Sequence, residues 1–247
     1  MTLPLAVNPF LFALTMTFGA AAIRGLTGFG MAIILVPLLG LVIEPAQAVV
    51  VAILLQLFIG PVGIGKIHAD AETASAIPIA VIAMLATPLG LWALGVTAPD
   101  LARLLIALIA IGAFLLVLLP AREGAVPGRL EVALTGIAAG ILTGFAAMPG
   151  PPVVPFYLRR KLPPVVSRAS MLLIFFATAI AGTLSAIALG SVDWAILLLS
   201  ALLFPAVLVG NWMGTKAFGT ISEPVWRSIV GVLLGVAGIA AVVRLAT

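Results

Sequence analysis

The 247-residue sequence contains no cysteine, one histidine and one tyrosine, and only 8% of its residues are charged. The absence of cysteine excludes disulfide bonds and thiolate metal sites. The low charge is the stronger constraint, because soluble domains carry about 25% charged residues. With 64% hydrophobic residues and a mean hydropathy of +1.36, the chain is predicted to be an integral membrane protein.

Apolar stretches recur along the whole chain, without the alternation that is typical of a membrane β-barrel. They fall at 8–23, 29–43, 46–64, 74–95, 101–119, 132–147, 151–158, 168–189, 194–215 and 225–245. Two of them, 29–43 and 151–158, are too short to cross about 30 Å of hydrocarbon. We predict an all-α polytopic membrane protein with about eight transmembrane helices, two of its regions being broken or re-entrant. The first stretch is expected to be a retained segment, because no basic residue precedes it.

The sequence Leu-Thr-Gly-Phe occurs at 26–29 and again at 142–145, each time inside an apolar stretch and followed by glycine and proline. Gly90 precedes Arg103 by the same interval that separates Gly214 from Arg227. These matches predict two structural repeats, at 1–120 and 132–247, joined by a cytoplasmic linker at 121–131. A helix break at membrane depth is tolerated only where it lines a cavity or is buried in protein. Two matching breaks therefore indicate a transporter with its substrate site between them.

The distribution of basic residues predicts that the repeats are inverted. If each interrupted region enters and leaves on one side, one face holds most of the loop cations, and Arg103 and Arg244 remain on the other. That face would hold Lys66, Arg122, Arg129, Arg159, Arg160, Lys161, Arg168, Lys216 and Arg227. If the interrupted regions cross fully, the basic residues divide more evenly. We therefore favour inverted repeats with both termini outside.

Arg24 is a charged residue that no loop explains, because it lies between Ala20–Ile23 and the glycine-rich break. An arginine at membrane depth is costly and usually faces a cavity or a partner. Its forked donors match oxyanions, so we predict that Arg24 binds an anion. The alternative is that the first helix starts deeper and that Arg24 snorkels to the interface.

The half-helices that follow the breaks would direct amide N–H groups and positive dipole ends towards the same anion. Two threonine hydroxyls at equivalent places would add donors. The predicted substrate site comprises Arg24, Thr27, Gly28, Phe29, Gly30, Gln56, Thr143, Gly144, Met148, Gly150 and Asn211. The alternative for the glycines is close helix packing, and for the two amide side chains it is interhelical hydrogen bonding. Phe29 and Met148 are expected to serve packing more than gating.

Enzyme chemistry lacks the residues it needs. His68 lies in a charged loop and is expected to be solvated, and every carboxylate flanks an apolar segment. Metal ligation, Ser-His proteolysis and a Walker A nucleotide site are therefore not predicted, and no cofactor is expected. The excess of basic residues lies in loops, which favours orientation in the bilayer over nucleic-acid binding.

The two break motifs are Arg24-Gly-Leu-Thr-Gly-Phe-Gly30, with Pro37 after it, and Gly140-Ile-Leu-Thr-Gly-Phe-Ala-Ala-Met-Pro-Gly150. Together with Gly90…Arg103 and Gly210-Asn-Trp-Met-Gly214…Arg227, they resemble the TauE/SafE sulfite exporter family, also described as 4-toluene sulfonate uptake permeases. The resemblance implies a bacterial inner-membrane transporter of sulfite, sulfonates such as sulfoacetate, or related organic anions. The second motif has Ala146 in place of Gly30 and no arginine matching Arg24, which implies an asymmetric site.

The expected function is export of such an anion, driven by the membrane potential and the substrate gradient, with alternating access between the repeats. The expected partners are the small anion and the lipid bilayer, and a homodimer remains open. Two alternatives are import of a sulfur-containing or carboxylate anion and a non-transporting membrane assembly or anchor subunit.

Overall fold

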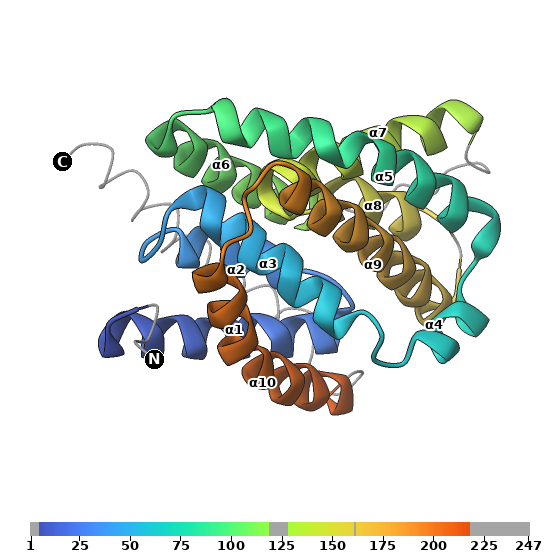
Figure 1. Ribbon diagram of the computed structural model, residues 1–247. Coiled ribbons are helices and arrows are strands. Elements are labelled where there is room, and N and C mark those ends of the chain that lie inside the picture. Colours follow the sequence, from blue (N-terminus) through green and yellow to red (C-terminus); the bar gives the residue numbers. More distant parts are fainter. Residues whose placement is uncertain (1–4, 119–127, 161, 218–247) are drawn as a thin grey trace.

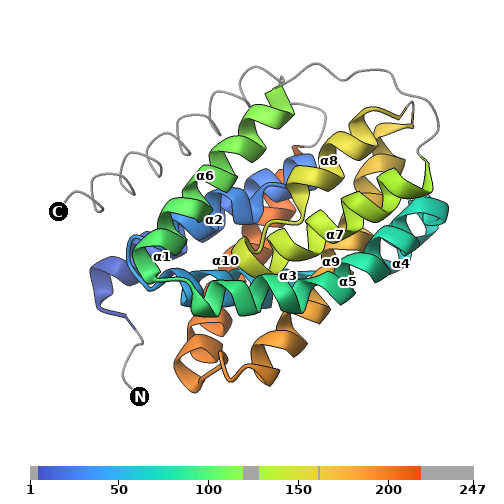
Figure 2. The same cartoon turned by 90° about the horizontal axis from the view of Figure 1, so that it is seen from above.

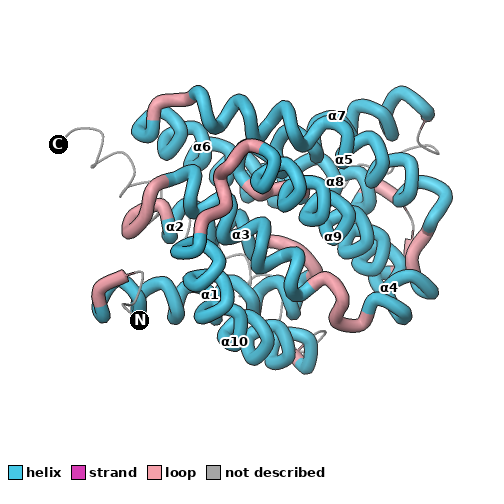
Figure 3. Tube along the Cα trace, viewed as in Figure 1, coloured by secondary structure: helices cyan, strands magenta, loops and turns pink. Residues whose placement is uncertain are grey.

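The computed structural model describes residues 5–118, 128–160 and 162–217, which form helices joined by short loops, with no strand in these ranges (Figures 1 and 3). The helices are α1 (Val7–Thr27), α2 (Met31–Leu39), α3 (Pro45–Ile59), α4 (Ile64–Asp70), α5 (Thr73–Val96), α6 (Pro99–Leu118), α7 (Arg129–Ala146), α8 (Gly150–Leu158), α9 (Pro164–Ala188) and α10 (Trp194–Lys216). The short segments predicted after the two breaks are the nine-residue helices α2 and α8. The segment 225–245, most of the linker 121–131 and both termini lie outside the described residues, as do Arg122, Lys161, Arg227 and Arg244.

Five helices of the described part are long and apolar enough to cross a membrane, namely α1, α5, α7, α9 and α10. Helices α3 and α4 would add a sixth span if they were counted together, but they are bent by 84° at their junction. The all-helical multi-pass membrane fold is thus confirmed for these residues, whereas the number of eight crossings stays a prediction.

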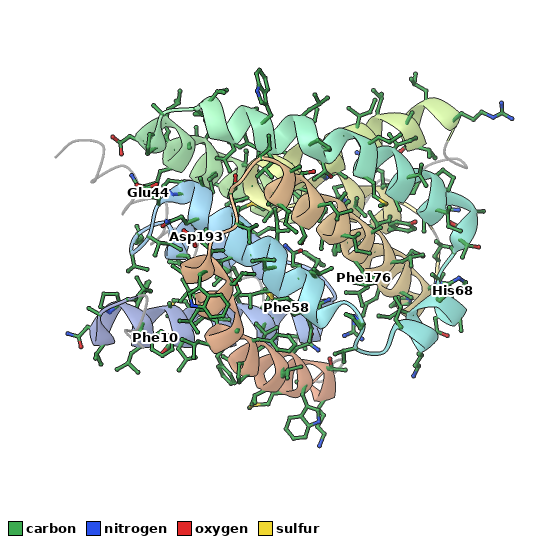
Figure 4. The ribbon with its side chains drawn as sticks, in the orientation of Figure 1. Phe10, Glu44, Phe58, His68, Phe176 and Asp193 are labelled. Atoms are coloured by element: carbon green, nitrogen blue, oxygen red, sulfur yellow. The ribbon has the colours of Figure 1, made fainter. Side chains whose placement is uncertain are left out.

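The prediction of a charged loop at 65–73 is wrong for most of its length, because Ile64–Asp70 form α4. The chain turns out of α3 at Gly63, where φ is +76°, a value that glycine adopts without strain. His68 lies exposed on α4, in agreement with the expected solvated histidine (Figure 4).

The centre of the molecule is built from helices that are apolar on every side. All nine residues of α2 are buried, and so is the run Val49–Leu55 of α3. A helix that is hydrophobic all round belongs in a protein core or in lipid, and these two lie in the core. In Figure 1, α2, α3, α8 and α9 lie between the α5–α7 pair along the top and the α1–α10 pair along the bottom.

Charged connections gather at one end of the bundle. Helix α4 and the first turns of α5 and α7 lie at the right-hand end of Figures 1 and 2, and the loops before α3 and α6 lie at the left-hand end. His68 and Glu44 mark these opposite ends in Figure 4. The two helices that precede the breaks, α1 and α7, run in opposite directions between the ends (Figures 1 and 2).

Helices α1 and α10 cross so closely that glycine is required at their contact. A Cβ added at Gly25 would lie 2.2 Å from the carbonyl oxygen of Asn211, and one at Gly214 would lie 1.9 Å from that of Ala22. No side chain fits at such distances. Gly210 and Gly214 form the small-xxx-small pattern that lets membrane helices approach backbone to backbone.

The α5–α7 pair repeats this crossing. A Cβ at Gly90 would lie 2.1 Å from the carbonyl oxygen of Ile141, and one at Gly140 would lie 2.2 Å from that of Ala83. Each crossing joins a helix that precedes a break in one half of the chain to a helix from the other half. The two halves are therefore interlocked.

A partly buried polar cluster joins α5, α8 and α9 at the charged end. The Glu72 carboxylate accepts hydrogen bonds from the Arg160 guanidinium at 2.7 Å and from Ser75, and the Tyr157 hydroxyl lies 3.0 Å from the Ser75 hydroxyl. The backbone N–H of Glu72 donates to the Ser170 hydroxyl at 2.8 Å. Burial by itself would raise the pKa of Glu72, but the Ser75 and Arg160 hydrogen bonds and the Arg160 charge outweigh it. The pKa therefore lies below the ordinary 4.5.

Replacing Gly90 by alanine is expected to destabilise the protein by about 1–3 kcal/mol, because the new methyl group would force α5 and α7 apart. The measurement is thermal unfolding of the purified protein in detergent. Gly95→Ala on the same helix is the control, since a Cβ there meets nothing within 4 Å. Equal melting temperatures for the two variants would show that α5 and α7 do not pack against each other at Gly90.

Glu72→Gln is expected to lower stability at pH 7 by about 1–2 kcal/mol, because it removes a charge-assisted pair. A carboxyl group with a lowered pKa stabilises the fold above its unfolded pKa and loses that effect as the pH falls through the folded value. The difference in melting temperature between wild type and E72Q should therefore be complete at neutral pH, shrink as the pH falls below the ordinary 4.5 and vanish only below the lowered pKa of the folded protein. A difference that is independent of pH would argue against the Glu72–Arg160 pair as its source.

Candidate functional site

The first break lies between α1 and α2 and depends on two glycines in the left-handed region. Gly28 has φ +85° and donates its N–H to the Arg24 carbonyl at 2.7 Å, and Gly30, with φ +91°, precedes the first residue of α2. The Thr27 hydroxyl lies 2.8 Å from the carbonyl oxygens of both Ile23 and Phe29, which share its single proton. The helix is thus interrupted with its free backbone groups partly paired inside the break.

The second break begins with an αL motif at the end of α7, in which Ala147 is the left-handed residue. The N–H of Met148 donates to the Leu142 carbonyl at 3.1 Å, and the N–H of Ala147 donates to the Thr143 carbonyl at 2.7 Å. Ala147 has φ +57°, a conformation that costs a non-glycine residue about 1 kcal/mol. The amide of Gln56, on α3, donates to the Ala147 carbonyl at 3.1 Å, and this contact helps to hold the strained residue.

The two breaks meet around a small cavity of about 20 Å³. Its lining comes from both breaks and from α3 and α9, and comprises Arg24, Phe29, Gly30, Met31, Ala32, Ile33, Gln56, Ala147, Met148, Pro149, Gly150 and Phe175. A cavity of this size holds about one water molecule. Two helix breaks that are far apart in the sequence therefore line the same small cavity.

The donors around this cavity come mainly from the first half of the chain. Residues 31–33 open α2, no side chain caps their N–H groups, and all three line the cavity. Helix α8 begins with Gly150 followed by Pro151 and Pro152, which have no N–H to offer. The positive end of each helix dipole still points at the break. The second motif lacks a counterpart of Arg24, and the start of α8 likewise offers fewer backbone N–H donors than the start of α2.

Arg24 lies between this cavity and a larger one. It lines both, and its Nη1 donates to Oδ1 of Asn211 on α10 at 2.8 Å. The side chain is half-buried and turned towards α10 within the protein. Both the anion-binding interpretation of Arg24 and the snorkelling alternative stay predictions.

The larger cavity, which we call the vestibule, has a volume of about 880 Å³. It lies between α1, α3, α4, α9 and α10, and its charged lining residues are Arg24, Lys66, Asp70 and Arg168. Apolar residues such as Leu172, Leu208 and Trp212 form much of the remaining wall. Within the described residues, no group of His, Asp or Glu side chains is placed to hold a metal ion.

The structure brings most of the predicted site residues together. Arg24, Phe29, Gly30, Gln56, Met148 and Gly150 line the small cavity, and Asn211 lines the vestibule. Gly28 lies against Arg168, and the Thr27 hydroxyl binds the backbone of its own break. Thr143 donates to the Ala139 carbonyl at 2.7 Å, and a Cβ at Gly144 would lie 2.2 Å from the Thr87 carbonyl oxygen. Thr143 is therefore bonded within α7, and Gly144 lies where α7 crosses α5. Direct contact of these two residues with the substrate stays a prediction.

The sequence predicts no structural contact for Arg103 or Arg168, because both lie at boundaries between loops and apolar segments. Arg168 lies in the second turn of α9, and its Nη2 donates to the Gly25 carbonyl at 2.6 Å. Arg103 is buried in α6, where Nε donates to the Gly40 carbonyl at the end of α2 at 3.0 Å. For Arg168 the available signal was the proline pair at 163–164, which starts a helix before the arginine.

Gln56→Leu is expected to lower the melting temperature by an amount equivalent to about 1–3 kcal/mol, because it leaves the Ala147 carbonyl without its partner. Gln56→Glu keeps the shape of the side chain but has no N–H donor when ionised, so it should destabilise as well. Thermal unfolding in detergent measures both. Wild-type stability in the two variants would show that the α3 contact does not hold the second break.

Comparison with known proteins agrees with this architecture. The profile of the family described as "Sulfite exporter TauE/SafE" matches residues 13–241. The chain is also 28% identical over 217 residues, 85% of either sequence, to a protein of Cupriavidus necator named "Probable sulfite/organosulfonate exporter TauE". No solved structure is significantly similar to the chain. Since the family profile covers nearly all of the sequence, this multi-pass membrane protein belongs to the TauE/SafE sulfite exporter family, whose members are transporters and not enzymes.

Proposed function

We propose that this protein exports a small sulfur-containing oxyanion, such as sulfite or sulfoacetate, across the bacterial inner membrane. The observation that carries the proposal is the meeting of two helix breaks beside Arg24. Such breaks are the binding elements of transporters built from repeats. The name of the Cupriavidus necator relative favours the same class of substrate.

In the proposed site the anion rests against Arg24 and the first-turn amides of α2. The guanidinium supplies charge and forked donors, and the α2 terminus supplies N–H groups aimed at the same point. Gln56 and Asn211 are each adjacent to one of these groups and can exchange their present bonds for the substrate. The other predicted site residues shape the breaks that hold these donors.

In the proposed conformation the vestibule is open and the central cavity between the two breaks is nearly closed. A cavity of about 20 Å³ admits about one water molecule, so a four-atom anion requires the centre to expand. The vestibule lies at the end that carries α4 and the first turns of α9. The positive-inside rule assigns that end to the cytoplasm, which makes this an inward-open state.

Transport by alternating access is proposed for two inverted repeats, 1–120 and 132–247. The opposite directions of α1 and α7 and the two matching glycine crossings support this symmetry. Because the crossings join the halves, the moving bodies are proposed to be the α1–α10 and α5–α7 pairs with their attached helices. A membrane potential that is negative inside would favour exit by about 2.3 kcal/mol per charge per 100 mV.

Arg24→Gln is expected to reduce sulfite or sulfoacetate flux about tenfold to a hundredfold, because a charge-assisted hydrogen bond to the substrate is lost. The measurement is uptake and efflux in proteoliposomes, with the potential set by potassium and valinomycin. Arg129→Gln is the matched control, since it removes the same charge from an exposed position at the start of α7.

Several results would contradict the proposal. Equal flux in R24Q and wild type would remove Arg24 from the site, and flux that is insensitive to voltage would argue against potential-driven export. Inward flux of the anion that exceeds its outward flux at physiological potential would favour an importer. Absence of flux for every anion tested would favour a non-transporting membrane subunit.

A further inference from the structure

Most of the side chains that line the central cavity are apolar. Arg24 and Gln56 are its polar side chains. The other side chains in the lining are those of Phe29, Met31, Ala32, Ile33, Ala147, Met148, Pro149 and Phe175. Apolar side chains offer an anion no hydrogen bond, so this part of the wall acts on a substrate through its shape.

Gly150 leaves space in the central cavity that helix packing does not require. It is not in the left-handed region. A Cβ added there would meet its nearest atoms at 3.8, 3.9 and 4.0 Å, on Val154, Ile33 and Phe175, which are ordinary van der Waals contacts. A methyl group at this position would therefore fit among its neighbours, but it would occupy a cavity that holds about one water molecule.

Phe175 is the bulky side chain that faces this space. Its Cζ would lie 4.0 Å from a Cβ at Gly150, and the residue is buried. Phe175 belongs to α9, which packs against α8. The same helix lines the vestibule through Leu172, one turn earlier. The ring therefore lies where the α9 wall passes from the vestibule to the central cavity.

The next residue of α9 has the same side chain in a different environment. The Phe176 ring packs against Gly60 at the end of α3, where an added Cβ would be 1.8 Å from the ring (Figure 4). Phe176 lines neither the central cavity nor the vestibule. It is therefore a matched control for changes at Phe175.

We infer that Phe175 and Gly150 set the size limit of the central site, which admits the sulfur-bearing head of the anion and excludes a branch next to the sulfur. The Phe175 ring turns aside to admit the head, and the glycine provides the room opposite the ring. The organic part of a sulfonate then extends past Arg24 into the vestibule, whose apolar wall and volume of about 880 Å³ accommodate a linear chain. The inference rests on the proposed function and adds the residues that select the shape of the substrate.

The test compares two sulfonates of the same composition and charge. 1-Propanesulfonate is linear, whereas 2-propanesulfonate is branched at the carbon bonded to sulfur. Binding of each to the full chain in nanodiscs is measured by calorimetry, with sulfite as the reference ligand. Wild type should bind the linear isomer at least about tenfold more tightly, because one misplaced methylene group in an apolar pocket changes recognition by about 10- to 200-fold.

Two variants of α9 test the source of this preference. F175L should reduce the ratio of the two affinities to less than about threefold, because the smaller side chain leaves room for the branch. F176L, the same change one residue later, should leave the ratio within about threefold of the wild-type value, since its ring lies outside both cavities.

Gly150→Ala tests the other side of the gap. It should weaken binding of both isomers about tenfold or more, and G150A/F175L should regain binding of the linear isomer because the smaller side chain restores the room that the methyl group takes. Glycine also relaxes the constraint that Pro151 places on the preceding residue, so the melting temperature of each variant is measured as well. A lowered melting temperature in G150A with unchanged affinity would assign Gly150 to the backbone alone and overturn its part in the inference. If G150A does not fold, the ratios in F175L and F176L decide.

Three results would overturn the inference and leave anion transport intact. They are a wild-type ratio near one, an unchanged ratio in F175L, and failure to bind 1-propanesulfonate when sulfite binds. Absence of binding for sulfite and both sulfonates, with no flux of any anion, would overturn the proposed function as well.

Discussion

The structure depends on the requirement that backbone polar groups find partners where no water is available. An uninterrupted helix meets this requirement within itself. At 28–30 and 147–149 the chain leaves the helical path, and the exposed groups are paired by Thr27, by the bond from Met148 to the Leu142 carbonyl and by Gln56. Buried helices that are apolar on every side, α2 and α3 above all, keep lipid away from both places.

The two breaks solve the same geometric problem with different residues. The first uses glycines at +85° and +91° and leaves three amides of α2 beside Arg24. The second places an alanine in the left-handed region and starts α8 with prolines. The result is a central point whose shape comes from both halves of the chain, but whose positive charge and hydrogen-bond donors come mostly from one.

Much of this arrangement could be read from the sequence. Apolar length gave the helices, and the duplicated Leu-Thr-Gly-Phe with its glycines and prolines located both breaks, because these residues act locally on the backbone. Contacts between residues far apart in the sequence could not be predicted in this way. The sequence puts Arg168 and Arg103 at boundaries between loops and apolar segments, and hydropathy cannot reveal that each side chain reaches a carbonyl of another helix. The helix α4 was missed for a related reason, because its charges are typical of a loop.

The interlocking of the halves constrains how this protein is made. During synthesis α1 enters the bilayer long before α10 exists. The Gly25 face of α1 therefore has no packing partner until Gly210 and Gly214 of α10 have been made. In the other crossing, α5 likewise lacks its packing partner until α7 has been synthesised. The amino-terminal half inserted by itself therefore has its closest helix contacts unmade. The last helix of the described chain, α10, completes a contact with α1, the first described helix to be synthesised.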